Sequence, residues 1–570
     1  MRPAYLGFGL PLVLLVPACG PGERTTVPAD LVLRGGAVYT VDAARSWATA
    51  LAVRDGRIVY VGTDSVPSGL LGPRTEVMNL AGGMVLPGFQ DGHVHLLAGG
   101  LELGQCTLYT LDAAAIADSV RACAAARPEA AWVLGAGWEL PAFPEANPSK
   151  TLLDRLVPDR PALFVAADGH SAWTNSRALA LAGITRDTRD PADGRIERDR
   201  RTGEPSGTLR ETAISLVSEL LPEPSAEELD AGLARGVRLA NQAGITSAFE
   251  ASVSERELRA FAAADRTGRL TIRIVAGMDG EPDSTGIDSL VHRLRRWRSS
   301  HATPRVRPRA VKLYQDGVIE SGTAALLAPY LDRAGNAGKP IYAQATLDSL
   351  TAALDREGWQ IHVHAIGDRA IRMTLDAFMR ARQANGGRDA RHTITHLQLI
   401  DPADIPRFRE LRVIANFEPL WANGDEYLTR LAEPALGRQR SRWLYPIASL
   451  AKAGAVVSGG SDWSVSSIAP LDGIQVAITR RSPEGPAGSA PWRPEEVVDL
   501  PTAIALYTIN AAYQLGQERE TGSIEVGKLA DLVVLERNLF AVAPTEIHRV
   551  RVLRTMVDGR TVYRSEGSSD

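Results

Sequence analysis

The stretch Leu86-Pro87-Gly88-Phe89-Gln90-Asp91-Gly92-His93-Val94-His95 places two histidines directly after an apolar run. Alternate side chains of an extended strand point the same way, so His93 and His95 would face one point. Neutral imidazole is a common metal ligand, and a pair on rigid backbone needs only one or two more donors to complete a site. Two histidines at a strand end can equally be ordinary polar rim residues, so the remaining chain has to decide.

The composition is that of an ordinary globular protein with more than one domain. The chain has 570 residues, of which 45% are hydrophobic and 23% are charged. This length exceeds what one hydrophobic core usually holds. Lys and Arg total 63 against 67 Asp and Glu, which leaves no basic excess to hold phosphates. We therefore expect no nucleic-acid partner.

The first 19 residues depart from this average. Residues 4–16 form an apolar segment broken by glycine and proline, which is short for a membrane span and fits a secretory signal peptide. Val16-Pro17-Ala18-Cys19 resembles the lipobox of bacterial lipoproteins, although a proline is unusual there. We expect an exported protein, either periplasmic or anchored to the membrane through a lipidated Cys19, with residues 20–29 as a tether. Plain cleavage and a disordered N-terminus are the alternatives.

Two cysteines, Cys106 and Cys123, remain beyond this segment. In an oxidising compartment two such cysteines are expected to pair. In the chain-entropy model the bridge would stabilise the fold by roughly 3 kcal/mol. Two buried free thiols are the alternative.

Short strand signals occur at both ends of the chain. Near the N-terminus two apolar runs meet at Asp55-Gly56, and near the C-terminus two more meet at Asp558-Gly559. An Asp-Gly pair between such runs is a strong hairpin signal. Neither end has enough strands to bury a face alone. We therefore predict one small β-sandwich domain built from residues 30–83 and 521–565.

Residues 84–520 have the pattern of an α/β fold, a TIM-like (β/α)8 barrel. Helical patterns such as residues 226–243 and 368–381 separate most of the strand candidates. In such barrels the active site lies at the carboxyl ends of the strands. The eight candidates are residues 84–95, 246–250, 272–278, 310–316, 361–365, 393–396, 413–418 and 456–462.

An inserted subdomain is expected between the first two barrel strands. About 150 residues separate them, far more than one helix needs. The subdomain would occupy about residues 100–225 and cover the mouth of the barrel. Its Trp138, His170 and Trp173 are candidates for lining a substrate pocket, and local packing is the alternative for each.

Other strand ends also carry side chains that can bind a metal. Lys312 lies on the fourth strand, and His364 lies on the fifth. His396 lies on the sixth strand and Asp462 on the eighth. His362 shares a face with His364, and we choose His364 because it is nearer the carboxyl end. Each residue alone has an ordinary structural explanation, but their ordered placement at strand ends favours a metal site.

The order Asp91-Gly92-His93-Val94-His95, Lys312, His364, His396 and Gly460-Ser461-Asp462 resembles the amidohydrolase superfamily of metal-dependent hydrolases. Within it the chain is similar to amidohydrolase family 3, the branch that includes N-substituted formamide deformylase. The likeness covers nearly the whole mature chain. It is specific for the superfamily but not for a substrate. Further motifs that carry it are residues 168–175, 311–317, 364–370 and 522–535.

The resemblance implies one or two divalent metal ions, with zinc as the default. His93, His95 and Asp462 would bind one ion, and His364 and His396 the other. Lys312 would be carboxylated and bridge them. Carboxylation would turn a costly buried cation into an anionic oxygen ligand. Other divalent metals, and a single-metal site with unmodified Lys312, stay open.

Two positions depart from the family pattern. Glu418-Pro419 stands where Gln-Pro is more usual, and Trp463-Ser464 follows Asp462 where a smaller residue and a proline are more usual. We expect Glu418 and Trp463 to reshape the substrate pocket. The deformylase's own substrate is therefore not carried over to this chain.

The resemblance predicts hydrolysis of an amide or a related non-peptide carbon–nitrogen bond in a small molecule by a metal-activated water. Asp462 would take a proton from the attacking water and deliver it to the leaving nitrogen. Hydrolysis of an ester or a cyclic amide on the same centre is one alternative. A non-catalytic tethered binding protein is the other. A homodimer is compatible with the sequence.

Overall fold

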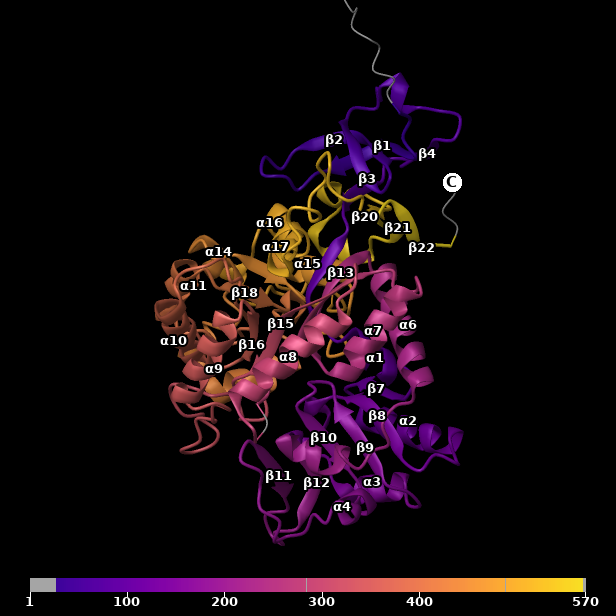
Figure 1. The fold of residues 1–570 in the computed structure, drawn as a ribbon. Coiled ribbons are helices and arrows are strands. Elements are labelled where there is room, and N and C mark those ends of the chain that lie inside the picture. The colour runs from indigo at the N-terminus through magenta and orange to yellow at the C-terminus, as the bar shows by residue number, and fades with distance from the viewer. Residues whose placement is uncertain (1–26, 283, 487, 567–570) are drawn as a thin grey trace, which may run out of the picture.

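The computed structural model describes residues 27–282, 284–486 and 488–566. The expected signal peptide, the Cys19 lipobox and residues 20–26 of the tether lie outside the described residues. Three β-sheets organise the described part, with a sheet from the chain ends at the top of Figure 1, a barrel in the middle and an inserted subdomain below. Within these ranges no helix combines the length and the apolarity that crossing a membrane requires.

The central sheet confirms the predicted (β/α)8 barrel. Its strands run parallel, and each pairs with the next in chain order. They are buried along most of their length, as parallel strands covered by helices must be. In order they are β6 (Phe89–Val94), β13 (Ile245–Val253), β14 (Arg273–Asp279), β15 (Val306–Tyr314), β16 (Gln360–Ala365), β17 (Thr393–His396), β18 (Ile414–Phe417) and β19 (Val457–Gly459).

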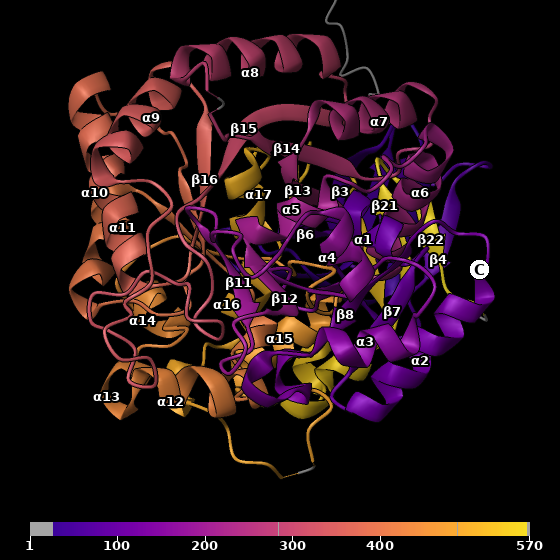
Figure 2. The same cartoon turned by 90° about the horizontal axis from the view of Figure 1, so that it is seen from below.

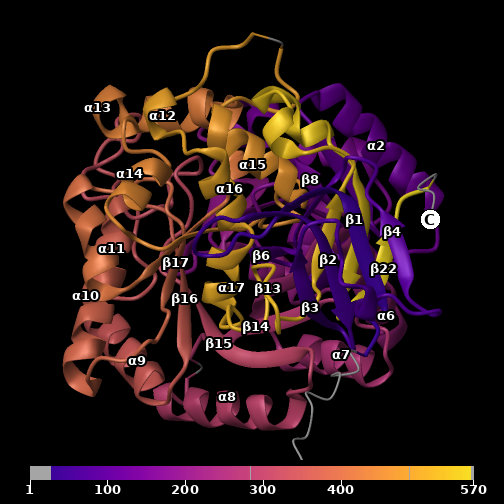
Figure 3. The same cartoon turned by 90° about the horizontal axis from the view of Figure 1, so that it is seen from above.

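Helices surround the barrel, as Figures 2 and 3 show from its two ends. Two of them match the helices predicted from periodicity, and the first of these begins with a capping box of Ser225 and Glu228. The outer helices are α6 (Ala226–Gln242), α7 (Glu255–Arg266), α8 (Ile287–His301), α9 (Gln344–Arg356), α10 (Asp368–Asn385), α11 (Ile405–Leu411), α14 (Ile447–Lys452), α15 (Pro470–Thr479) and α16 (Leu500–Leu506). α17 (Ile509–Leu515) lies instead at one end of the barrel (Figure 3), where Leu515 packs against Phe249 and Val275.

The first and last barrel strands meet through a few specific contacts rather than a full ladder. The backbone N–H of Asp462 donates to the carbonyl of His93 at 2.8 Å. The carboxylate of Asp91 accepts hydrogen bonds from the backbone N–H of Ser461 at 3.0 Å and from its hydroxyl at 2.6 Å. A Cβ on Gly92 would lie 2.7 Å from a backbone oxygen of β19, so only glycine allows this approach.

The strand predicted over residues 84–95 is in fact two strands. β5 (Met84–Pro87) pairs with strands of the sheet at the chain ends, and β6 alone belongs to the barrel. The break falls at Pro87-Gly88, because proline has no N–H to continue a ladder. The boundary predicted after residue 83 therefore lies after Pro87.

Strands from both chain ends share one sheet, as expected. Both Asp-Gly hairpins are present, in β2–β3 and in β21–β22. The two halves predicted as a sandwich form one continuous sheet that branches at β1, because β1 changes partners across the irregularity at Gly35-Gly36. The strands are β1 (Leu31–Tyr39), β2 (Trp47–Arg54), β3 (Arg57–Gly62), β4 (Glu76–Asn79), β5, β20 (Leu532–Leu535), β21 (Val552–Val557) and β22 (Arg560–Arg564).

The inserted subdomain lies over one end of the barrel, and the sheet formed by the chain ends lies at the other (Figures 1 and 2). It follows α1 (Leu96–Glu102), and the expected pairing of Cys106 with Cys123 is present as a disulfide between β7 and α2. Its elements are β7 (Cys106–Thr110), α2 (Ala113–Ala126), β8 (Val133–Trp138), α3 (Lys150–Leu156), β9 (Ala162–Ala166), β10 (Ser171–Thr174), α4 (Ser176–Leu181), β11 (Gly194–Arg198), β12 (Pro205–Glu211) and α5 (Ser215–Ser218).

A buried ion pair joins the barrel to the sheet at the chain ends. Arg273 on β14 contacts the Asp531 carboxylate at 2.8 Å and also pairs with Asp558. We predict that Arg273→Met lowers the free energy of unfolding by about 3 kcal/mol, because it leaves the Asp531 charge buried without its partner. Urea unfolding measures this loss.

The matched control is Arg296→Met, which removes an exposed pair with Glu255 at 3.5 Å. It should cost less than about 1 kcal/mol. An equal loss in both variants would contradict the role assigned to Arg273.

Candidate metal centre

The six residues predicted as metal ligands line one cavity at the carboxyl ends of the barrel strands. The cavity has a volume of about 930 Å³ and is roofed by the inserted subdomain. His93 lies near the end of β6 and His95 directly follows that strand, while Lys312, His364 and His396 lie on β15, β16 and β17. Asp462 follows β19. The fold therefore gathers residues that lie up to 369 positions apart in the printed sequence.

Asp462 lies at the centre of this group. Its Oδ1 is 3.2 Å from His95 Nε2 and 3.5 Å from His93 Nε2, and its Oδ2 is 3.9 Å from His396 Nδ1. The His95 contact lacks hydrogen-bond geometry, so Oδ1 is buried without a hydrogen-bond partner. Burial alone would raise the pKa of Asp462, but contacts with His95, His396 and Lys312 hold it below its usual value.

This donor set fits a divalent cation. His93, His396 and Asp462 each offer one ligand atom within 4.8 Å of the others, and all three residues are buried. An ionised, buried carboxylate oxygen without a partner is costly unless a cation completes its surroundings. Imidazole with carboxylate is the combination that zinc and similar metals prefer. Which residues bind metal stays a prediction.

Lys312 reaches the same point from β15. Its side chain is 1% exposed, and its Nζ lies 3.4 Å from His93 Nε2. Burial lowers the pKa of Lys312 to about 7, against the opposing charges of Asp462 and Glu418. A large fraction of the amine is therefore neutral near pH 7, the form that can be carboxylated.

His362 supports the site from outside the cavity. His364 lines the cavity, as predicted, and His362 does not. His362 Nε2 lies 2.9 Å from His93 Nδ1. The His362 ring stacks on the Phe249 ring with the two centroids 4.2 Å apart. His362 therefore fixes the orientation of His93, which is the usual role of a partner behind a metal ligand.

Glu418 was predicted to line the substrate pocket, and this prediction is wrong. The side chain is fully buried behind His396, and His396 Nδ1 donates to its Oε2 at 3.0 Å. Its Oε1 accepts a hydrogen bond from the hydroxyl of Thr395 at 3.3 Å. Glu418 is turned into the barrel instead of the cavity because these two donors hold it there.

Trp138 and Trp173 were also expected in the pocket, but both lie in the core of the inserted subdomain. Each indole N–H is satisfied by a backbone carbonyl, that of Phe164 for Trp138 and that of Ser149 for Trp173. A large aromatic ring gains more from complete burial there than from facing water. His170 does line this cavity, and Trp463 lines a second cavity that adjoins it.

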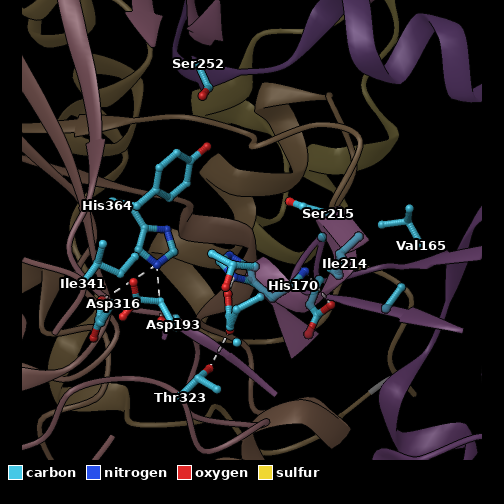
Figure 4. A pocket seen from close by; sticks show the side chains of 18 of the residues that line it. Val165, His170, Asp193, Ile214, Ser215, Ser252, Asp316, Thr323, Ile341 and His364 are labelled. Atoms are coloured by element: carbon cyan, nitrogen blue, oxygen red, sulfur yellow. Dashed lines mark hydrogen bonds and ion pairs between the residues drawn. The ribbon is translucent and has the colours of Figure 1, made fainter. Parts of the chain in front are cut away.

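His170 belongs to a pair that links the inserted subdomain to the barrel rim. Its Nδ1 is 2.7 Å from Glu211 Oε2, and Glu211 Oε1 accepts from the Thr323 hydroxyl at 2.6 Å. Burial opposes protonation, but Glu211, Asp168 and Asp462 together raise the pKa of His170 to about 9. The protonated ring of His170 therefore lies beside His364, with the two ring centroids 5.0 Å apart (Figure 4). No sequence pattern had indicated Glu211 or Thr323.

Glu250 is a further residue that the sequence reasoning missed. It lies near the end of β13 and accepts hydrogen bonds from the backbone N–H groups of Leu96 at 2.9 Å and Leu97 at 3.2 Å. These residues directly follow His95, so Glu250 fixes the turn that carries His95. Asp462 was identified because a carboxylate ends the strand predicted over residues 456–462. Glu250 ends the strand predicted over residues 246–250 in the same way, so the same signal could have identified it.

A (β/α)8 barrel with histidines and an aspartate gathered at the carboxyl ends of its strands agrees with the comparisons with known proteins. Residues 76–563 match the family model described as amidohydrolase family, and this chain belongs to that family. Protein LONG AFTER FAR-RED 3 of Arabidopsis thaliana is 31% identical over 94% of this chain and 92% of its own length.

Two further relatives extend this likeness. N-substituted formamide deformylase of Arthrobacter pascens is 29% identical over 95% of this chain and 99% of its own length. An uncharacterised metal-dependent hydrolase from Pyrococcus horikoshii has the same fold, with a TM-score of 0.70 and 22% identity over 90% of this chain and 99% of its own.

We predict that Glu418→Ala weakens Zn²⁺ binding by about 10- to 100-fold, because His396 loses the carboxylate that orients its ring. Competition against a coloured chelator measures the affinity. Glu418→Gln keeps an oxygen acceptor for His396, so its Zn²⁺ affinity should fall less than that of Glu418→Ala. Unchanged affinity in Glu418→Ala would contradict the assigned role.

Proposed function

We propose that this protein hydrolyses an amide or a related carbon–nitrogen bond other than a peptide bond. The observation that carries the proposal is the ionised Asp462, whose buried Oδ1 lacks a hydrogen-bond partner among the predicted ligands. The name of the Arthrobacter relative supports the bond class, because that protein is called a deformylase of N-substituted formamides. A small-molecule substrate suits a cavity of about 930 Å³.

One or two divalent cations, with zinc as our choice, would be held at the cavity floor. His93, His95 and Asp462 would hold one, His364 and His396 the other, and a carboxylated Lys312 would serve both. A cation bound there supplies Lewis acidity, which polarises the substrate carbonyl and makes a water molecule more acidic.

Asp462 performs the proton transfers. Its low pKa keeps the carboxylate ionised at neutral pH, so it can accept a proton from the attacking water. It then returns that proton to the departing nitrogen, because an amine leaves poorly until it is protonated. The hydrogen bond between Glu418 and His396 keeps one wall of the site in place during these steps.

We also propose that the protein is exported and anchored through Cys19. The Cys106–Cys123 disulfide supports export, because such bonds persist in oxidising compartments. Hydrolysis of an ester or a cyclic amide on the same centre is separated from the leading proposal by a substrate panel.

We predict that Asp462→Asn lowers kcat/KM by about 1,000-fold, because the asparagine cannot accept a proton. Hydrolysis of a panel of amides measures the loss, and metal analysis should show that most metal is retained. Asp118→Asn, an exposed change on the inserted subdomain, should have no effect. Full activity in Asp462→Asn would refute the assigned role.

We predict that removal of metal with dipicolinate abolishes hydrolysis and lowers the midpoint of thermal unfolding, because like-charged and unpaired groups are left buried together. Stoichiometric Zn²⁺ should restore both. A metal-free preparation with full activity would show that these residues do not form a catalytic metal site.

A further inference from the structure

Two chambers open from the predicted metal centre. The wide chamber is the cavity already described, and a narrow chamber of about 560 Å³ adjoins it. Asp462, His170, His364 and His396 border both. A substrate with its scissile bond at Asp462 would therefore place one part in each chamber, and the lining of each chamber selects what it accepts.

Aromatic rings form much of the narrow chamber's wall: Trp421, Tyr427, Tyr445 and Trp463. Trp421 stacks on His396 with ring centroids 5.6 Å apart and an interplanar angle of 8°. The Trp421 indole N–H and the Tyr427 hydroxyl are tied down by hydrogen bonds of 3.0 Å and 2.7 Å. The fixed rings offer apolar area and electron-rich faces, which attract cations.

Carboxylates complete the same wall: Glu139, Asp168, Glu320 and Asp425. Among the described residues no lysine or arginine lines the narrow chamber, whereas Arg195 and Lys339 line the wide one. Burial raises the pKa of Glu320 to about 7, and the charges of Asp168 and Asp425 add to this rise. The narrow chamber thus gathers four carboxylates against the single protonated ring of His170, which leaves an excess of acidic groups on its wall.

A buried polar atom on this wall has no hydrogen-bond partner among the described residues. Oδ2 of Asp168 is buried and unpaired, although Oδ1 of the same carboxylate accepts from the His170 N–H at 3.0 Å. A ligand in the chamber can supply the partner that this buried carboxylate oxygen lacks.

We propose that the narrow chamber binds the positively charged end of the substrate, so that the preferred substrate is an amide bearing an ammonium group on an apolar spacer. The aromatic faces and the carboxylates both favour such a group, whereas the carboxylates would repel an anionic group. The inference rests on the proposed function for the scissile bond, but the binding preference can be measured separately.

The test uses two formamides of the same shape, one ending in trimethylammonium and the other in tert-butyl. Calorimetry with metal-loaded Asp462→Asn protein measures their affinities without turnover. We expect the ammonium compound to bind at least about tenfold more tightly. Hydrolysis by the wild-type enzyme is measured in parallel.

Glu320→Gln and Asp425→Asn, each added to the Asp462→Asn protein, should reduce this preference by about tenfold. The new amides can still accept the hydrogen bonds from Gln398 at 2.7 Å and from the Leu428 N–H at 3.0 Å, so the fold is preserved. Glu426→Gln is the matched control. Glu426 neighbours Asp425, but it pairs with Arg430 and does not line the chamber.

Equal affinity for the two formamides would overturn the inference, as would a preference that survives in both chamber variants. Cleavage of the two compounds at equal rates would refute the inference while leaving the hydrolase proposal standing. Preferred binding of the ammonium compound together with a failure to cleave any amide would refute the hydrolase proposal and leave the chamber assignment standing.

Discussion

The site depends on how the first and last barrel strands meet. His93 and His95 reach Asp462 only because the Asp91 carboxylate accepts hydrogen bonds from both the backbone N–H and the hydroxyl of Ser461. That carboxylate is itself buried, which raises its pKa to about 7. The remaining predicted ligands come from neighbouring parallel strands, whose carboxyl ends lie together in any such barrel.

A layer of buried partners supports these residues from behind. His362 contacts His93, Glu250 holds the turn after His95, and Glu418 holds His396. The backbone adds strain, since His396 has a φ of 76° and Asp462 a φ of 49°. Buried charge and left-handed backbone at non-glycine residues both cost free energy, and they persist where the rest of the fold determines a functional geometry.

Strand ends were predictable because an apolar run that stops at a polar residue marks where a buried parallel strand reaches the rim. This pattern predicted the barrel and the six candidate ligands, Asp462 among them. The direction of single side chains was not predictable: Glu418 and Trp138 turn inward because of partners distant in sequence. For the same reason the break between β5 and β6 was hidden in one continuous apolar pattern, although Pro87 marked it.

Anomalous diffraction at the zinc edge from crystals of zinc-loaded protein tests the central claim most directly. The account predicts one or two strong peaks among His93, His95, His364, His396 and Asp462, with Lys312 in contact. An absence of metal there, with hydrolysis retained in the same preparation, would contradict it.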